Sequence, residues 1–134
     1  GTFVAQVVEA SVEDGAIRVH RVTCAADCGR MVNPDIVRMQ MEGGILFGLT
    51  AALYGEVDWD DNGRLQQSNF HDYTLMRHNE TPELNILLVE NGEEPQGVGE
   101  PGTPPAIPAL GNALFALTGE RQRRTPFRAG SADA

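Results

Sequence analysis

The sequence contains no lysine, so its positive charge comes from arginine alone, and 19 acidic residues outnumber these 10 basic ones. The resulting net charge of −9 argues against nucleic acid or an anionic membrane surface as a partner. Apolar runs are short: the uncharged stretch 43–55 has 13 residues, fewer than the ~20 that a membrane helix requires. Four of the ten arginines form a cluster near the C-terminus, at Arg121, Arg123, Arg124 and Arg128. Such a cluster suits carboxylate or phosphate groups, although a solvated basic end is the simpler interpretation.

Residues for metal or disulfide chemistry are also few. The chain has two cysteines, Cys24 and Cys28, and three scattered histidines. Two thiols alone cannot hold a tetrahedral zinc ion or an iron–sulfur cluster. If the stretch between them is extended, their Cα atoms lie about 13 Å apart, which is too far for a disulfide. We therefore expect two buried free thiols and no metal ligands from this chain.

The polar and apolar pattern predicts several strands. Residues 3–10 and 17–22 read as two strands of a hairpin that turns at Asp14-Gly15. Asn62-Gly63 is a second strong hairpin signal. Further along the chain we expect a hairpin of 56–60 with 64–68, a buried strand at 84–89 and an edge strand at 121–128.

Two helices complete an α+β class, in which a mixed sheet of short strands and hairpins accompanies helices over about 34–54 and 105–118. Asn33-Pro34 is a typical helix start, with an N-cap and a proline in the first turn. Gly119 supplies the C-terminal stop of the second helix. We expect a single domain or part-domain over 1–128 and a flexible tail over 129–134.

Glycines in the first helix require an explanation, because each costs about 1 kcal/mol relative to alanine. Gly44 and Gly48 stand four apart and share a helix face. Something must therefore approach that face closely. Another helix or sheet and the edge of a ligand both fit this pattern.

The segment 97–102, Gly-Val-Gly-Glu-Pro-Gly, is the clearest candidate for chemistry. Its glycines let a ligand approach the backbone, and the proline after Glu100 biases that residue toward extended geometry. A carboxylate presented in this way can act as a general base. From composition alone, a solvent-exposed loop glutamate is the competing interpretation.

With its neighbours, this segment resembles the xanthine oxidase/aldehyde oxidase family of molybdenum hydroxylases, in particular the isoquinoline 1-oxidoreductase beta-subunit branch. The segment 97–105, Gly-Val-Gly-Glu-Pro-Gly-Thr-Pro-Pro, resembles the family's active-site loop. Cys24 to Pro34 is similar to its strand-to-helix entry, Gln-Met-Glu-Gly-Gly-Ile at 40–45 to its cofactor-side helix, and Ser-Asn-Phe-His-Asp-Tyr at 68–73 to a following loop. The resemblance covers about residues 1–128.

The resemblance implies a hydroxylase that uses molybdenum in a molybdopterin cofactor, in bacterial members usually molybdopterin cytosine dinucleotide. The counterpart of Glu100 is the general base, which takes a proton from a molybdenum-bound hydroxide, and the oxygen then attacks an electron-poor carbon of an N-heteroaromatic compound or an aldehyde. The counterpart of Gln40 hydrogen-bonds the pterin. The other cofactor-side positions are Gly43, Gly97, Val98 and Gly99.

The family's molybdenum-binding subunit is several times longer than this chain, so the chain is expected to be a C-terminal fragment that is inactive alone. The implied partners are the upstream part of the same subunit, a separate [2Fe-2S] subunit and a small-molecule substrate. Localisation, bacterial cytoplasm or periplasm, stays open because a signal region is not visible here. The alternative is a non-catalytic binding or assembly module that keeps the fold. If the Gly44/Gly48 face and the 97–100 loop are exposed, a homodimer that buries part of the 34–54 helix is expected.

Overall fold

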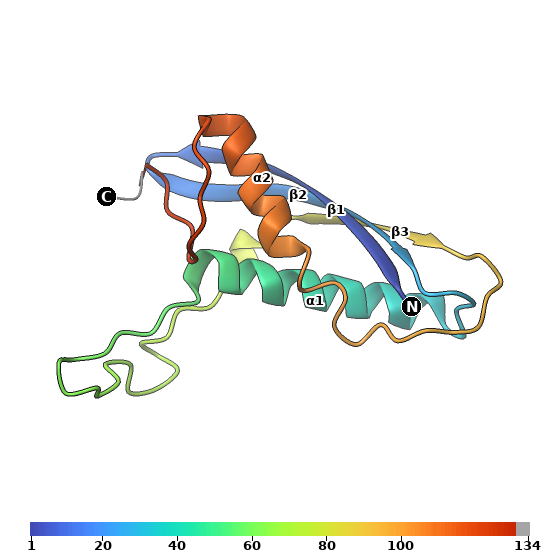
Figure 1. Cartoon of the computed structure of the whole chain (residues 1–134), viewed down its shortest axis with the longest axis horizontal. Coiled ribbons are helices and arrows are strands. Elements are labelled where there is room, and N and C mark those ends of the chain that lie inside the picture. Colours follow the sequence, from blue (N-terminus) through green and yellow to red (C-terminus); the bar gives the residue numbers. More distant parts are fainter. Residues whose placement is uncertain (131–134) are drawn as a thin grey trace.

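The computed structural model describes residues 1–130, and its architecture is α+β, as the sequence predicts. Three strands form one sheet in the order β1-β2-β3, with two long helices packed on it (Figure 1). The elements are β1 (Phe3–Glu13), β2 (Ala16–Asp27), α1 (Pro34–Tyr54), the 3-10 helix η1 (His78–Glu80), β3 (Glu83–Val89) and α2 (Ala106–Thr118).

The hairpin of β1 and β2 confirms the first predicted turn. The two strands pair antiparallel as far as Glu13 and Ala16, which are joined by Asp14 and Gly15. Both linking residues have positive φ, 50° and 77°, as a two-residue turn between twisted strands requires. A register shift between Glu9 and Ala10 marks a bulge. The long hairpin therefore brings the first residues of the chain beside the last residues of β2.

Helix α1 links β2 to β3, which pair in parallel. It begins as predicted, because the Asn33 side chain accepts a hydrogen bond from the Ile36 N–H at 3.2 Å. Helix α2 ends as predicted at Gly119, whose φ of 77° is left-handed. Both predicted helices are confirmed.

The core lies between one face of the sheet and the two helices. Its fully buried side chains come from β2, α1 and α2, among them Val22, Met41, Ile45, Leu49, Leu110 and Leu114. On β1, buried or half-buried residues alternate with exposed ones, so Phe3 and Val7 face away from the helices. The helices thus cover a single face of the sheet.

The strand predicted at 84–89 is confirmed, but this one-sided cover makes its predicted burial wrong. The run forms β3, but its residues are not buried on both sides: Leu87 is 50% and Val89 46% exposed. The expected strand at 121–128 is also wrong. The N–H of Phe127 instead donates to the carbonyl of Ala52, and the buried Phe127 ring packs against Gly111 of α2.

The second predicted hairpin is reduced to a turn at Gly63, closed by one bridge between Trp59 and Leu65. It belongs to a segment that projects beyond the C-terminal end of α1 (Figure 1). The predicted tail falls mostly outside the described residues, which end at 130. Within residues 1–130, no helix combines the length and apolar character needed to cross a membrane.

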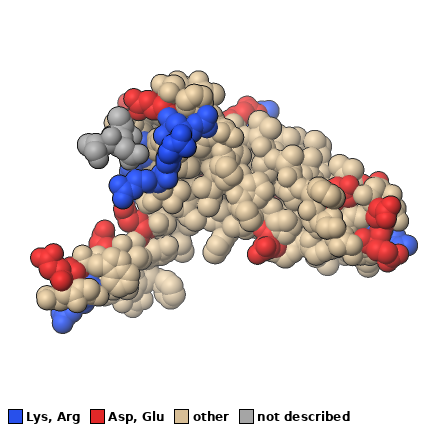
Figure 2. Space-filling model, in the orientation of Figure 1, with Lys and Arg blue, Asp and Glu red and all other residues tan. Residues whose placement is uncertain are grey.

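Arginines gather beside the C-terminal end of α2 (Figure 2). Arg128 forms an ion pair with Glu56 at 2.5 Å, and Arg121 stacks on the Phe115 ring at 3.9 Å from its centroid. These two arginines therefore act within the chain and tie its C-terminal segment to the end of α1 and to α2.

Candidate functional site

The loop 97–102 joins the segment after β3 to α2 and runs along the N-terminal half of α1 (Figure 1). Gly97 and Gly99 are exposed, and a Cβ at either would have no heavy atom within 4 Å. Val98, between them, is half-buried against the core. Within residues 1–130, the backbone N–H groups of 97–100 make no hydrogen bond. The loop thus keeps backbone donors that are not used within the described chain and that can serve an electron-rich ligand.

Glu100 is exposed on this loop, and its carboxylate contacts no partner within the described part of the chain. Its backbone carbonyl accepts a hydrogen bond from the Thr103 N–H at 2.8 Å. That bond closes a turn with Pro101 at its second position, where the fixed φ of proline is favourable. The carboxylate is therefore free for an external group while the backbone that carries it is held.

Gln40 connects α1 to the loop. Its Nε2–H donates to the carbonyl of Gly99 at 2.6 Å, which leaves one amide N–H and the oxygen of this exposed side chain for a ligand. Gly43 lies one turn further along α1, exposed and open. All six residues predicted for the site therefore lie on α1 or on the loop that runs along it. Two are on α1, Gln40 and Gly43, and four are on the loop, Gly97, Val98, Gly99 and Glu100.

Sequence reasoning missed three further side chains, two that bind the loop and one that ties the end of the loop to α1. The Thr2 hydroxyl donates to the carbonyl of Gly97 at 2.6 Å, and Gln6 Nε2–H donates to that of Gly102 at 2.8 Å. The Thr103 hydroxyl donates to the carbonyl of Gly44 at 3.0 Å. Gln6 carried a usable signal, because it is a polar residue in the inward-facing row of β1.

The close approach predicted for the glycine face of α1 is confirmed, and the neighbour is the chain itself. A Cβ on Gly48 would lie 2.6 Å from the Thr103 carbonyl oxygen, and one on Gly44 would lie 3.3 Å from the Thr103 hydroxyl oxygen. The expectation that this face is exposed is therefore wrong. The homodimer stays a prediction, and on α1 it would use exposed residues outside this glycine face, such as Met39 and Phe47, which are 68% and 72% exposed.

A shallow hollow of about 570 Å³ lies beside Glu100. Its lining comes from the N-terminus and the loop: Gly1, Thr2, Gln96, Gly97, Gly99, Glu100 and Pro101. Its surface is formed largely by backbone and small side chains. No cluster of three or more metal-ligating side chains occurs within residues 1–130.

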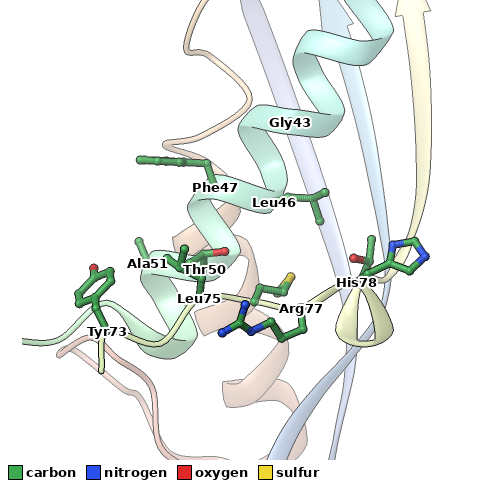
Figure 3. A pocket seen from close by; sticks show the side chains of 11 residues that line it. Gly43, Leu46, Phe47, Thr50, Ala51, Tyr73, Leu75, Arg77 and His78 are labelled. Carbon is green, nitrogen blue, oxygen red and sulfur yellow. The ribbon is translucent and has the colours of Figure 1, made fainter. Parts of the chain in front are cut away.

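A second, more apolar hollow of about 500 Å³ lies on the exposed side of α1 (Figure 3). Phe47 and Ala51 of α1 form one wall, and Tyr73 and Leu75 of the following segment face them. It begins at Gly43, one helical turn after Gln40. The candidate site and this hollow therefore share Gly43 of α1.

The family-like motif at 24–34 lies beside the segment that leads into the loop, where the Cys28 carbonyl accepts from the Gln96 N–H at 2.8 Å. The motif at 68–73 lies apart from Glu100. In the segment 68–73, Asp72 accepts hydrogen bonds from the N–H groups of Ser68 and Asn69, which hold the pKa of its carboxyl down, at about 2. This segment projects from the opposite end of α1 (Figure 1). Cys24 and Cys28 are free and buried, as predicted. Burial raises the pKa of both thiols, which suits packed cysteines rather than ligands.

Sequence comparison identifies one family: residues 1–82 match the molybdopterin cofactor-binding domain. The chain is 43% identical over 115 residues to isoquinoline 1-oxidoreductase subunit beta of Brevundimonas diminuta, a match that covers 86% of this chain and 15% of that protein. It is 39% identical over 114 residues to a membrane-bound aldehyde dehydrogenase [pyrroloquinoline-quinone] of Gluconacetobacter polyoxogenes, covering 85% of this chain and 15% of that protein.

Among solved structures, a Cu,Mo-CO dehydrogenase superposes with a TM-score of 0.76 at 24% identity, over 88% of this chain and 16% of that one. At this identity the likeness shows the shared fold. The chain spans about 15% of the length of the curated relatives named above.

Proposed function

Because the chain belongs to the molybdopterin cofactor-binding domain family, we propose that it supplies the general base of a molybdenum hydroxylase. The chain corresponds to a short part of the large, molybdopterin-binding subunit of xanthine oxidase-type hydroxylases. In this proposal the base is the Glu100 carboxylate. Activity, substrate and partners belong to a complete enzyme of which this chain would form one wall of the active site.

The observation that carries the proposal is the hydrogen bond from Gln40 to the Gly99 carbonyl at 2.6 Å. It joins the two segments whose sequences resemble the family's cofactor-side helix and active-site loop, although 59 positions separate these residues. A shared surface of Gln40, Gly43 and the loop fits a large flat cofactor, because both loop glycines are open to solvent and a bulky residue is absent at Gly43.

Each proposed residue has a physical task. The N–H groups of Gly97, Val98 and Gly99 would donate to electron-rich atoms of the bound cofactor, and Gln40 would add its remaining amide groups. Molybdopterin, when bound, supplies the redox chemistry. The Glu100 carboxylate would accept a proton through one of its Oε atoms as the new carbon–oxygen bond forms. Within residues 1–130, no cation forms an ion pair with this carboxylate.

The finer features of the proposal follow the relatives. An N-heteroaromatic compound or an aldehyde is the proposed substrate class, since one relative is named for isoquinoline and another for an aldehyde. We propose the cytosine dinucleotide form of the cofactor, the upstream part of the same subunit as the other wall of the site, and a separate [2Fe-2S] subunit as electron acceptor. The quinone cofactor named for the second relative is the competing possibility.

Cofactor analysis of the full-length natural subunit distinguishes these forms. Metal analysis should find molybdenum, and hydrolysis of the extracted cofactor should release cytidine monophosphate. Recovery of pyrroloquinoline quinone without molybdenum would refute the cofactor assignment.

The base is tested by Glu100→Gln in that full-length subunit, assayed with an N-heteroaromatic compound and an aldehyde. Loss of a general base lowers turnover by typically ~10²–10⁴-fold, and we expect this loss at unchanged molybdenum content. Glu93→Gln is the matched control, because Glu93 is exposed in the same connection and its side chain makes no bond within residues 1–130. Only its backbone is bonded, with its N–H donating to Asn91 Oδ1 and its carbonyl accepting from the Arg30 N–H. If Glu100→Gln keeps more than about a tenth of wild-type turnover, Glu100 is not the base, and the non-catalytic module becomes the better interpretation.

A further inference from the structure

Gln6 is the polar exception in the inward-facing row of β1. Its neighbours in that row, Val4, Val8 and Ala10, are apolar and belong to or pack on the core. Placing an amide in such a row costs free energy unless the amide is hydrogen-bonded. Gln6 lies opposite Cys24 in the register, and its Oε1 is buried without a partner among residues 1–130. The Gln6 side chain also lies within hydrogen-bond reach of the Cys24 thiol. The bond made by its Nε2 to a backbone carbonyl is therefore a main part of what offsets the cost of this position.

That bond reaches the candidate site. The acceptor is the carbonyl oxygen of Gly102, at 2.8 Å. Gly102 is buried, and a Cβ there would lie 2.9 Å from the Met41 carbonyl oxygen. It is also the third residue of the turn that the Thr103 N–H closes on the Glu100 carbonyl. Gln6 thus holds a carbonyl inside the turn that begins at Glu100.

Thr2 holds the other end of the loop. Its hydroxyl donates to the carbonyl of Gly97 at 2.6 Å, so Thr2 and Gln6, near the start of the chain, bracket the loop at 97 and 102. The Gln40 amide holds Gly99 between them, from α1. A segment with three glycines has many accessible backbone conformations, and each of these bonds removes some of them.

We propose that Gln6, assisted by Thr2, is a positioning residue that fixes the 97–102 loop and thereby the place of the Glu100 carboxylate. The proposal rests on the assignment of Glu100 as the base. A base must lie within hydrogen-bond reach of the proton it removes, and small misplacements are costly to turnover. Gln6 performs this task through the backbone and makes no contact with Glu100 itself.

The first test uses Gln6→Met in the 134-residue chain, because methionine has a similar length and no donor. Losing the net free energy of one hydrogen bond raises the population of the open loop about fivefold. We therefore expect the Thr103 amide to exchange about fivefold faster in NMR-detected hydrogen exchange. Nitrogen-15 relaxation should show lower order at 97–100. The amides of β2 should keep their wild-type rates. Ser11→Ala, which removes a side-chain bond to Glu13 elsewhere on β1, should leave the Thr103 amide unchanged.

In Gln6→Glu, the hydrogen bond to the Gly102 carbonyl should depend on pH. The neutral acid can donate to the Gly102 carbonyl, whereas the ionised carboxylate can only accept. We expect Thr103 exchange near the wild-type rate when the acid is protonated and faster exchange when it is ionised, each compared with wild type at the same pH. The Thr2→Val and Thr2→Ser pair gives an independent check on an exposed bond: valine should loosen the loop, and serine should keep it ordered.

A merely structural role for Gln6 predicts different results. Equal acceleration of exchange throughout the sheet, or an unchanged Thr103 amide in both Gln6→Met and Thr2→Val, would overturn the proposal. In the full-length subunit, Gln6→Met should lower kcat about fivefold at unchanged KM and molybdenum content, and an unchanged kcat would also overturn it. The experiments distinguish failure of the Glu100 assignment from failure of the Gln6 assignment. Full activity of Glu100→Gln removes the base, while site-specific loosening in Gln6→Met would still identify the anchor of the loop.

Discussion

Two irregular segments lie at opposite ends of α1, and they are held in different ways (Figure 1). The 97–102 loop is bonded to residues far away in the sequence, with separations of 95, 59 and 96 positions for the bonds of Thr2, Gln40 and Gln6. The projecting segment 56–75 is held mainly by bonds within itself. Asp60 accepts from the Arg64 N–H, and Asp72 accepts from Ser68.

The comparison shows that two segments can be equally exposed and yet be held in place to different degrees. Both segments are exposed and rich in glycine or polar residues, which makes them similar as sequences. Bonds to distant elements can break only if part of the packed structure opens, whereas local bonds can open alone. The 97–102 loop is therefore anchored firmly enough to present a fixed surface to a ligand. The projecting segment, with its local bonds, can open without the rest of the structure.

The strongest test of the comparison is a pair of glycine substitutions in α1. Gly48→Ala should destabilise the chain by about 1–3 kcal/mol through overpacking, because a Cβ there would lie 2.6 Å from the Thr103 carbonyl oxygen. Gly43→Ala should stabilise it by about 1 kcal/mol, since alanine favours the helix and the position has no heavy atom within 4 Å of a Cβ. Urea denaturation measures both changes.

The same pair tests the surface on which the cofactor is proposed to bind. In the full-length subunit, Gly43→Ala should lower molybdenum content in spite of the higher stability, because its methyl group stands on that surface. If Gly48→Ala is as stable as wild type, the loop can move away from α1 without cost. The contrast between an anchored and a free segment would then be wrong.

Local signals made most of the fold predictable. The positive φ angles at Asp14 and Gly15 and the cap at Asn33 depend on neighbours in the sequence, and the predicted hairpin and helix are confirmed. The predicted burial of the 84–89 strand is wrong because the cover of a sheet face depends on where the helices pack. The 121–128 segment was misjudged because Phe127 packs on α2, a tertiary contact that no local pattern encodes.

The candidate site was predictable only as separate motifs. The sequence indicates Glu100 and Gln40 through their resemblance to a family, and it indicates a close approach through Gly44 and Gly48. It does not indicate that Gln40 bonds to Gly99, because that contact depends on how a 21-residue helix lies against a later loop. The role of Gln6 is hidden for the same reason, although its polarity in an apolar row marks it as unusual.

A smaller effect is expected at the base of the projecting segment. The Tyr54 hydroxyl donates to Glu80, and burial, together with this bond and the Glu80 charge, raises the pKa of Tyr54 to about 12. The folded pKa lies above the usual value of 10, so the stabilisation is fully present below pH 10 and is lost as the pH rises through about 12. Tyr54→Phe should cost about 1 kcal/mol at neutral pH, measured by urea denaturation.

The phenolate absorbance provides the control for this prediction. A component that titrates near pH 12 in wild type should be absent from Tyr54→Phe. If the variant matches wild type in stability, the bond contributes nothing net, and the segment is joined to α1 less firmly than the structure indicates.

The smallest global effect is expected within the projecting segment, at Asp72. Its carboxylate accepts bonds from the Ser68 and Asn69 N–H groups and from the Ser68 hydroxyl, and the backbone bonds are the main cause of its pKa of about 2. Because the folded pKa lies below the usual 3.8, the stabilisation is present above about pH 4 and is lost as the pH falls toward 2. Asp72→Asn weakens these bonds by removing the charge.

If the segment is held mainly by bonds within itself, Asp72→Asn should leave the urea midpoint of the whole chain at its wild-type value at pH 7. Limited proteolysis at neutral pH should nevertheless cut the segment faster, because its turn opens locally without the sheet. Backbone exchange in 68–72 should differ from wild type at pH 7, and the difference should shrink as the pH falls toward 2, where about half of the wild-type carboxylate is protonated. Asp61→Asn is the matched control, since Asp61 is exposed in the same segment and its side chain has no bond within residues 1–130.

A loss of global stability in Asp72→Asn comparable to that of Gly48→Ala would mean that the projecting segment is as firmly integrated as the 97–102 loop. Order would then no longer distinguish the candidate site from the rest of the surface.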